Sequence, residues 1–425
     1  MSLRLFPPMT NSPKVALIQL ISEQTIPNLF PICALRPSVL IHLTTPKTAS
    51  RAFHIKNAAL VAGVDAEFFN RPISSAMPGI QETAFFVGQA IQIARERNLL
   101  PMVNFTGGTK LMSIGAFQQA AKDQVPSFYV DTQSHCFVDG ETGGDIRPFF
   151  GGEVSFSKII AGLTLDVMVV ASGHQSVSKG RDWRRHLAAA QAVRDNSEDT
   201  RQLRDVLEHE EKGIFPKGNL PRDPAGWLRV LNAPFPVPPS LFPHLLAAGL
   251  LDPTSTPEAA LLPSGTGPEL EVLAKAKAEK NYLDNFSGRC FAAMQPLQHF
   301  PIFITGGWWE VIVTDAFERA GRFRDLRWSA DVIQQGGSDL EEDILALDGC
   351  DAVCVSCKVR GVRLVPHLDE LNGRSKAIGG TFTRAFLALQ QPPNGKAWKD
   401  LQARARQLRI RLITPESIDR PESFD

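Results

Sequence analysis

The chain lacks the long apolar segments and the charge excess that mark membrane proteins and basic coat proteins. No apolar run reaches the roughly 18 residues that a membrane-spanning helix needs, and residues 1–13 have neither the apolar region nor the cleavage pattern of a secretory signal. We therefore expect a cytoplasmic protein with no membrane partner. Lys plus Arg number 45 and Asp plus Glu also number 45. This balance argues against a constitutive coat but allows a nuclease, whose acidic metal site offsets a basic groove.

Cysteine is scarce, with six residues scattered among apolar neighbours. In a chain without a secretion signal this pattern predicts reduced, buried thiols. The spacing of Cys350, Cys354 and Cys357 could indicate zinc, but Cys354 lies inside an apolar strand pattern and no matching Cys or His pair follows. Zinc is therefore disfavoured.

The length of 425 residues, with 43% apolar content, is enough for two or three domains. We expect an N-terminal α/β domain over residues 1–158, a connector over 159–289 and a C-terminal α/β domain over 290–425. In the connector the strand pattern stops, and amphipathic helices are expected at 183–204 and 269–280, separated by a Pro-rich stretch at 216–243. Residues 245–251 resemble the helix and turn of a winged-helix module.

The N-terminal third alternates apolar strands with helical patterns, which predicts a parallel sheet with helices on both faces. Strands are expected at 15–21, 39–43, 67–69, 99–104, 128–130 and 135–138, and helices from about residue 48 and at 82–98 and 111–121.

Three polar loops follow strands of this sheet. They carry Gln24, Pro27 and Asn28, then Thr44 and Thr45, then Thr106, Gly107, Gly108, Thr109 and Lys110. Glycines let a ligand approach the backbone closely, Lys110 adds positive charge, and the following helix directs its amides to the same point. Since ligands gather beyond the carboxyl ends of parallel strands, the loops predict a phosphate-bearing ligand. A tight turn without a ligand is the alternative.

The third loop departs from two common phosphate-binding motifs. It has neither the four-residue gap and Gly-Lys-Ser/Thr ending of a Walker A loop nor the Gly-x-Gly-x-x-Gly fingerprint. ATP hydrolysis and NAD binding are therefore disfavoured.

Acidic residues border an apolar strand in the C-terminal third. Glu341 and Asp343 precede four apolar residues, and after a hairpin signal a second strand ends in Ser356, Cys357 and Lys358. Glu310 follows two glycines, expected to form a turn, and should lie near the first turn of a helix. Mg²⁺ and Mn²⁺ prefer carboxylate oxygens, so these acids predict metal-dependent phosphodiester hydrolysis.

The ligand loops resemble those of the CARF (CRISPR-associated Rossmann fold) family. The resemblance rests on Gln24-x-x-Pro27-Asn28, on Thr44-Thr45 and on the stretch from Asn104 to Met112. It implies a homodimer that binds one cyclic oligoadenylate, usually cyclic tetra-adenylate, across its two-fold axis.

Residues from about 285 to the end resemble the PD-(D/E)xK, or restriction-endonuclease-like, fold. The resemblance implies that Asp343 is a metal ligand and that Lys358 orients water or stabilises charge on the phosphorane. Ser356 stands where this family has an acid, so Glu310 or Glu341 would supply the missing carboxylate. The alternative is an inactive scaffold.

Two function classes follow from these resemblances. The first is a cyclic tetra-adenylate-activated endonuclease of type III CRISPR antiviral defence, dependent on Mn²⁺ or Mg²⁺, acting on DNA or RNA. The second is a ligand-responsive, non-catalytic DNA-binding regulator with a degenerate nuclease scaffold. Arg181, Arg184 and Arg185 beside Trp183 could contact nucleic acid or simply form a solvated face.

Overall fold

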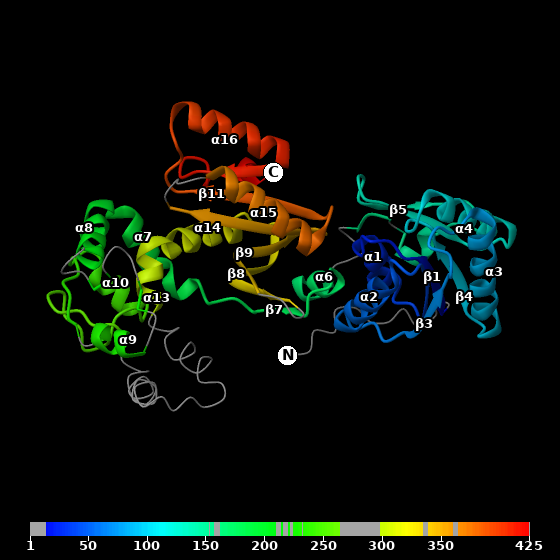
Figure 1. Cartoon of the computed structure of the whole chain (residues 1–425), viewed down its shortest axis with the longest axis horizontal. Helices are drawn as coiled ribbons and strands as arrows, with labels where there is room; N and C mark the ends of the chain where they lie inside the picture. Colours follow the sequence, from blue (N-terminus) through cyan, green and yellow to red (C-terminus); the bar gives the residue numbers. More distant parts are fainter. Residues whose placement is uncertain are drawn as a thin grey trace.

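The described part of the protein is built on two six-stranded sheets that lie side by side (Figure 1). The computed structural model describes residues 14–424, apart from 153, 157–161, 210–213, 216–219, 222–223, 232, 264–297, 335–338 and 360–363. Within these residues no helix is long and apolar enough to cross a membrane.

The first sheet has the strand order β3-β2-β1-β4-β5-β6. Its strands are β1 (Val15–Leu20), β2 (Val39–Thr44), β3 (Glu67–Pro72), β4 (Leu100–Asn104), β5 (Ser127–Asp131) and β6 (Cys136–Asp139). The first five are parallel, whereas β6 runs antiparallel to β5. The parallel sheet inferred from the sequence is confirmed for the first five strands, and β6 is added antiparallel, because its connection to β5 is a tight turn in which His135 has a φ of 51°.

Helices cover both faces of this sheet, as predicted from the alternating pattern. They are α1 (Ile26–Leu35), α2 (Ala49–Val61), α3 (Ile80–Glu96) and α4 (Lys110–Lys122). Side chains of α3 and α4 share one core with Ile18 and Ile41, while those of α1 and α2 share the opposite core with Leu17 and Leu40. Helix α1 begins where the sequence predicted a loop, because Pro27 occupies its first turn, a position that needs no backbone donor.

The second sheet has the order β12-β11-β10-β9-β8-β7. Its strands are β7 (Ser176–Val177), β8 (Phe323–Ile333), β9 (Leu340–Asp348), β10 (Asp351–Lys358), β11 (Thr383–Leu389) and β12 (Ile410–Ile413). Strands β7 to β10 are antiparallel, and β10 to β12 are parallel. Gly349, at a φ of 61°, lies in the predicted hairpin between β9 and β10.

Helices also lie on both faces of the second sheet. Helix α14 (Trp308–Arg319) packs on one face, and α15 (Leu364–Gly379) and α16 (Gly395–Leu408) pack on the other. The glycine turn expected before α14 is wrong. Gly307 is helical, with a φ of −59°, and the π-helix Phe303–Gly307 runs directly into α14.

The middle of the chain is mainly helical. It contains α6 (Leu165–Ala171), a 3-10 turn (Arg184–His186), α7 (Leu187–Asp195), α8 (Ser197–Glu208), α9 (Pro224–Leu231), α10 (Phe242–Ala247) and α13 (His299–Ile302). Strand β7 interrupts the helical pattern that the sequence predicted. The amphipathic helix expected at 269–280 lies outside the described residues.

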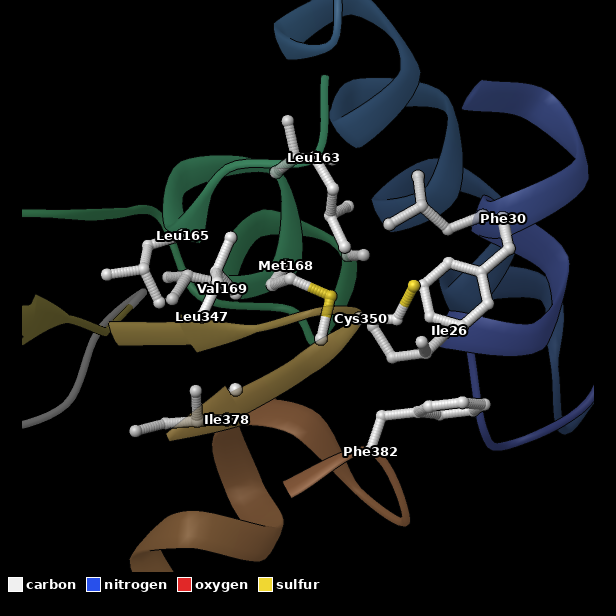
Figure 2. Packing of buried hydrophobic residues seen from close by; sticks show 14 of the residues in the cluster. Ile26, Phe30, Leu163, Leu165, Met168, Val169, Leu347, Cys350, Ile378 and Phe382 are labelled. Carbon is white, nitrogen blue, oxygen red and sulfur yellow. The ribbon is translucent and has the colours of Figure 1, made fainter. Parts of the chain in front are cut away.

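A continuous apolar core joins the two sheets (Figure 2). Helix α6 contributes Leu165 and Met168 to it, and α1 contributes Phe30. From the second sheet, Phe382 inserts its ring edge-on against Phe30, with 4.7 Å between ring centroids. Next to this contact the Thr381 hydroxyl donates to Gln24 Oε1 at 3.3 Å, so a predicted ligand loop touches the turn that leads into β11.

Candidate functional site

The three polar loops meet at the carboxyl ends of β1, β2 and β4. In the parallel register Gln19 lies between His42 and Asn104. Gln19 Oε1 accepts from Asn104 Nδ2 at 2.9 Å and from Asn28 Nδ2 at 3.3 Å, and all these side chains are fully buried. The Asn28 side chain therefore points into the sheet and ties the first loop to it, rather than pointing into solvent. The sequence analysis overlooked Gln19 and His42, although polar residues inside apolar strands were a visible signal.

Buried His42 belongs to the same network, since its Nε2 lies 3.4 Å from Gln19 Nε2. Burial lowers the pKa of His42 to about 3, so the imidazole is neutral at any ordinary pH.

The third loop is shaped by close backbone packing. A Cβ on Gly107 would lie 2.0 Å from the Leu20 carbonyl oxygen, and Gly108 has a φ of 77°, so neither position accepts a side chain without rearrangement. The Thr106 hydroxyl donates to Asn104 Oδ1 at 2.6 Å, and Thr109 caps α4 by accepting from the Met112 amide. The loop is thus fixed before any ligand binds.

The predicted ligand residues divide into two groups by exposure. Gln24, Gly108, Thr109 and Lys110 are exposed, and Lys110 has no ion pair within the described residues. The others are buried or half-buried and hold the loops in place, namely Pro27, Asn28, Thr44, Thr45, Thr106 and Gly107. Direct ligand contact is therefore open to the side chains of Gln24, Thr109 and Lys110 and to the backbone of Gly108.

The second predicted site lies where β9 and β10 meet α14. Asp343 Oδ2 accepts from the Cys357 amide at 2.6 Å, lies 3.3 Å from the Ser356 hydroxyl and 3.7 Å from Lys358 Nζ. The structure thus brings Asp343, Ser356 and Lys358 together as the sequence predicted. Both charged side chains remain partly accessible, with 21% of Asp343 and 32% of Lys358 exposed.

Glu310 reaches this group from the first turn of α14. Its Oε2 accepts from the indole Nε1 of Trp328 at 2.8 Å. Burial, and next the charge of Asp343, raise the pKa of Glu310 to about 8. Lys358 and Glu341 also act electrostatically on Glu310, so all four groups share one environment. Glu341 is exposed at the entrance of β9.

A break in the side-chain alternation of β8 and β9 separates the acids that face this site from the acid that does not. Trp328 and its partner Ile344 belong to the core under α14, whereas Ala330, opposite Glu342, belongs to the core under α15. The alternation breaks at Ser329, which has a φ of 50°. Glu342 is consequently fully buried, and its carboxylate lies 2.9 Å from Arg374 Nε of α15. Burial raises the pKa of Glu342 to about 8.

The donor set at this site suits a hard divalent cation. Within the described residues no three His, Cys, Asp or Glu side chains form a ready-made metal cluster. Carboxylate oxygens are nevertheless the ligands that Mg²⁺ and Mn²⁺ prefer. The repulsion from Asp343 that raises the pKa of Glu310 is the interaction that a cation between the two groups would reverse. Asp343 and Glu310 are therefore the residues that fit a metal, with Glu341 at the edge.

The cysteines near this site are free thiols. Cys350, Cys354 and Cys357 are buried, as predicted, and burial raises the pKa of Cys350 to about 12. Neutral thiols in an apolar environment are poor metal ligands.

Comparison with known proteins identifies the first domain. A family model described as the Card1 CARF domain matches residues 16–139. Among solved structures, Can2 from Sulfobacillus thermosulfidooxidans in complex with cyclic tetra-adenylate is similar, with a TM-score of 0.61 and 16% identity over 96% of this chain and 97% of that chain. No curated protein sequence matches the chain.

A second solved structure, protein VC1899 from Vibrio cholerae, has a TM-score of 0.65 at 13% identity, and 96% of each chain is covered. At this identity the two structures show the fold alone. The family match supports the CARF domain inferred over residues 16–139, and the two structures confirm the α/β fold class.

Proposed function

We propose that the protein is a homodimeric, cyclic tetra-adenylate-activated endonuclease of type III CRISPR antiviral defence. The observation that carries the proposal is the convergence of Glu310, Asp343 and Lys358 at one strand end, in a chain whose other sheet is a CARF domain. A regulator that only bound DNA would have no use for opposed carboxylates beside a lysine.

The ligand is proposed from the charge and geometry of the N-terminal loops. Exposed Lys110 and the amides at the start of α4 favour phosphate, Gly108 and Thr109 directly precede them, and Gln24 is exposed on the loop after β1. The solved relative Can2 binds cyclic tetra-adenylate, which makes this cyclic nucleotide the first candidate.

A homodimer is proposed from an apolar face next to that loop. Leu111, Ile114 and Phe117 recur on one side of α4 and are 51%, 43% and 39% exposed, and Phe85 of α3 is 61% exposed. Adjacent large apolar side chains in solvent indicate a covered interface. A symmetric partner would bring two copies of the Lys110 loop together, matching a cyclic ligand with two-fold symmetry.

At the nuclease site each residue has a distinct role. A bound Mn²⁺ or Mg²⁺ would activate water and neutralise charge on the phosphate. Asp343 and Glu310 would hold it, and the Cys357 amide and the Trp328 indole orient their carboxylates. Lys358, beside Asp343, would stabilise the negative charge that develops on the phosphorane.

The test is cleavage of DNA and RNA substrates by the whole protein with Mn²⁺, with and without cyclic tetra-adenylate. We expect cleavage that needs both, and loss of cleavage in Asp343→Ala with ligand binding unchanged. A protein that bound the cyclic nucleotide but cut no substrate would instead support the non-catalytic regulator. Wild-type cleavage in Asp343→Ala would place the reaction elsewhere.

A further inference from the structure

Three cations lie close together between β7 and α7 without acidic partners. Lys179, Arg181 and Arg185 form no ion pair or side-chain hydrogen bond that involves the described residues. We call these three residues the cationic segment. Five other arginines around the second sheet behave differently, because each of them is paired with a carboxylate. These are Arg319 with Asp315, Arg322 and Arg384 with Asp348, Arg374 with Glu342, and Arg404 with Asp369.

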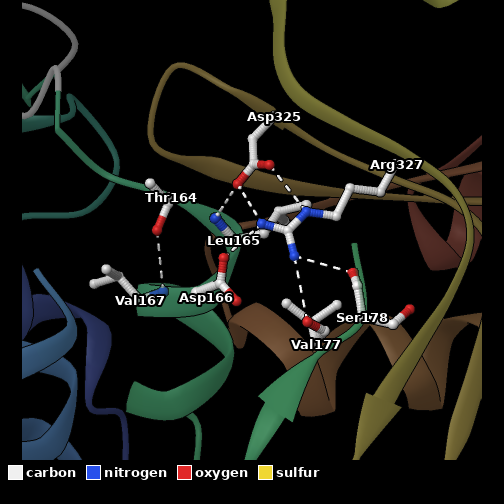
Figure 3. Close-up of polar contacts among 8 residues, drawn as sticks. All are labelled: Thr164, Leu165, Asp166, Val167, Val177, Ser178, Asp325 and Arg327. Carbon is white, nitrogen blue, oxygen red and sulfur yellow. Dashed lines mark hydrogen bonds and ion pairs between the residues drawn. The ribbon is translucent and has the colours of Figure 1, made fainter. Parts of the chain in front are cut away.

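The cationic segment is held firmly against the edge of the second sheet. Arg327 of β8, only 10% exposed, is ion-paired with Asp166 and Asp325 and donates to the carbonyl oxygens of Val177 and Ser178 at 3.4 and 3.0 Å (Figure 3). The Ser178 amide also donates to the Asp331 carbonyl at 2.8 Å. The chain that leads into the cationic segment therefore has a fixed path.

The same path brings the cations beside the carboxylate site. The Arg181 amide donates to the Trp328 carbonyl at 2.8 Å, while the Trp328 indole donates to Glu310. Gly180 permits this approach, since it has a φ of 71° and a Cβ there would lie 2.6 Å from the Trp328 oxygen. One tryptophan thus separates the cationic segment from Glu310.

Two histidines that are neutral at ordinary pH lie beside these cations. The His186 ring packs against Trp328 with 5.5 Å between centroids, and its buried Nδ1 has no hydrogen-bond partner in the described part of the chain. Burial, and then the charges of Arg185 and His299, lower the pKa of His186 to about 4. Burial and the charge of Arg181 likewise lower the pKa of His299. Arg181 and Arg185 are thus close enough to these rings to disfavour their protonation.

A nuclease with this site needs such charges close by. The carboxylates that would hold a metal repel the substrate, which carries one negative charge per roughly 3.4 Å of strand. The whole chain has a formal net charge of +0, so no general field attracts nucleic acid. Attraction must come from local cations that are not already neutralised.

We propose that the cationic segment binds the nucleic-acid backbone, holding the phosphates that flank the scissile one. The inference rests on the proposed nuclease function and adds the path of the substrate strand. The strand would run along the β7 edge of the sheet, past Trp328, with Lys179, Arg181 and Arg185 on its phosphates. Phosphate contacts of this kind position a strand without reading its sequence.

Binding can be measured separately from cleavage. In the full chain carrying Asp343→Ala, with cyclic tetra-adenylate present, fluorescence anisotropy would follow binding of labelled single-stranded DNA, duplex DNA and RNA over a series of salt concentrations. Adding Arg181→Ala and Arg185→Ala should weaken binding of the preferred strand about tenfold or more near 0.1 M salt. The slope of log K against log salt should fall by about 1.4 to 1.8, the value for two lost phosphate contacts.

Arg194→Ala is the matched control, because Arg194 lies on α7, is exposed and is already paired with Asp195. It should leave affinity and slope unchanged. If the double variant does not fold, Lys179→Ala, at an exposed position, tests the same contact, and it should also lower the affinity and the salt slope. Unchanged affinity and slope in the cationic variants, no binding by the parent, or equal binding of polyglutamate would each overturn the proposal. Strand binding that depends on these residues without cleavage in the wild type would reject the nuclease function and leave the binding path standing.

Discussion

The indole of Trp328 should control how readily the proposed nuclease site loads a metal. Its Nε1 donates to Glu310 Oε2 at 2.8 Å, and that carboxyl has a pKa raised to about 8. A metal binds the ionised carboxylate, and at pH 7 only about one Glu310 side chain in ten is ionised. Apparent Mn²⁺ affinity in the wild type should therefore rise about tenfold per pH unit up to about pH 8, and then level off.

Trp328→Phe keeps the aromatic packing and removes the donor. A hydrogen bond to a charged group contributes about 1.5 to 3 kcal/mol, which corresponds to an increase of about one to two units in the pKa of Glu310. At pH 7 the variant should then bind Mn²⁺ about ten- to a hundredfold more weakly. The deficit should shrink as the pH rises, because both proteins become ionised.

Calorimetric Mn²⁺ titrations between pH 6.5 and 8.5, in buffers with different ionisation enthalpies, measure both affinity and proton release. Release of nearly one proton per metal is expected near pH 7 in the wild type. Glu310→Gln is the control, since it should bind metal weakly and without this pH dependence. A wild-type affinity independent of pH, or equal affinities in wild type and Trp328→Phe, would refute the assignment of Glu310 as a ligand.

Four further outcomes are expected. Lys110→Ala should weaken cyclic tetra-adenylate binding about tenfold or more in calorimetry, because a charge-assisted phosphate contact is lost. In single-turnover cleavage, Lys358→Ala should lose roughly 10² to 10³ in rate, whereas Ser356→Ala should lose little, because a hydroxyl is a weak ligand. Thr381→Val, which frees Gln24, should lower the activator concentration for half-maximal cleavage about two- to tenfold. His42 stays neutral in the folded protein but takes up a proton below about pH 6.5 in the unfolded chain. The free energy of unfolding should therefore fall by about 1.4 kcal/mol for each pH unit below that value. In urea denaturation, His42→Leu should lose less stability between pH 7 and pH 5 than the wild type.

The sequence was most informative where structure is local. The strands β1, β2 and β4 are apolar runs bounded by turn residues, so their positions and the loops after them could be predicted. Asp343, Ser356 and Lys358 could be proposed as neighbours from the sequence, because Asp343 directly precedes the apolar run of β9 and the other two lie near the end of β10.

Other features depended on partners distant in the chain. Three consecutive acids at the start of β9 could not be sorted by alternation, because the alternation breaks where β9 pairs with β8 near Ser329, and Glu342 there lies against Arg374 of α15. The helical path through Gly307 was equally hidden, since glycine permits a turn but does not require one. The role of Trp328 beside Glu310 appears only when two elements are packed together.

The shared core around Phe30, Met168 and Phe382 limits how this protein can be divided or recombined. A cut between the two sheets would expose this apolar core to solvent on each half. The separate halves should therefore aggregate when they are expressed alone. Exchanging the N-terminal half for that of a distant relative would meet the same obstacle. A working chimaera should need α1, α6 and the Phe382 turn to be transplanted as one unit, which suggests that the two halves diversified together and not as interchangeable modules.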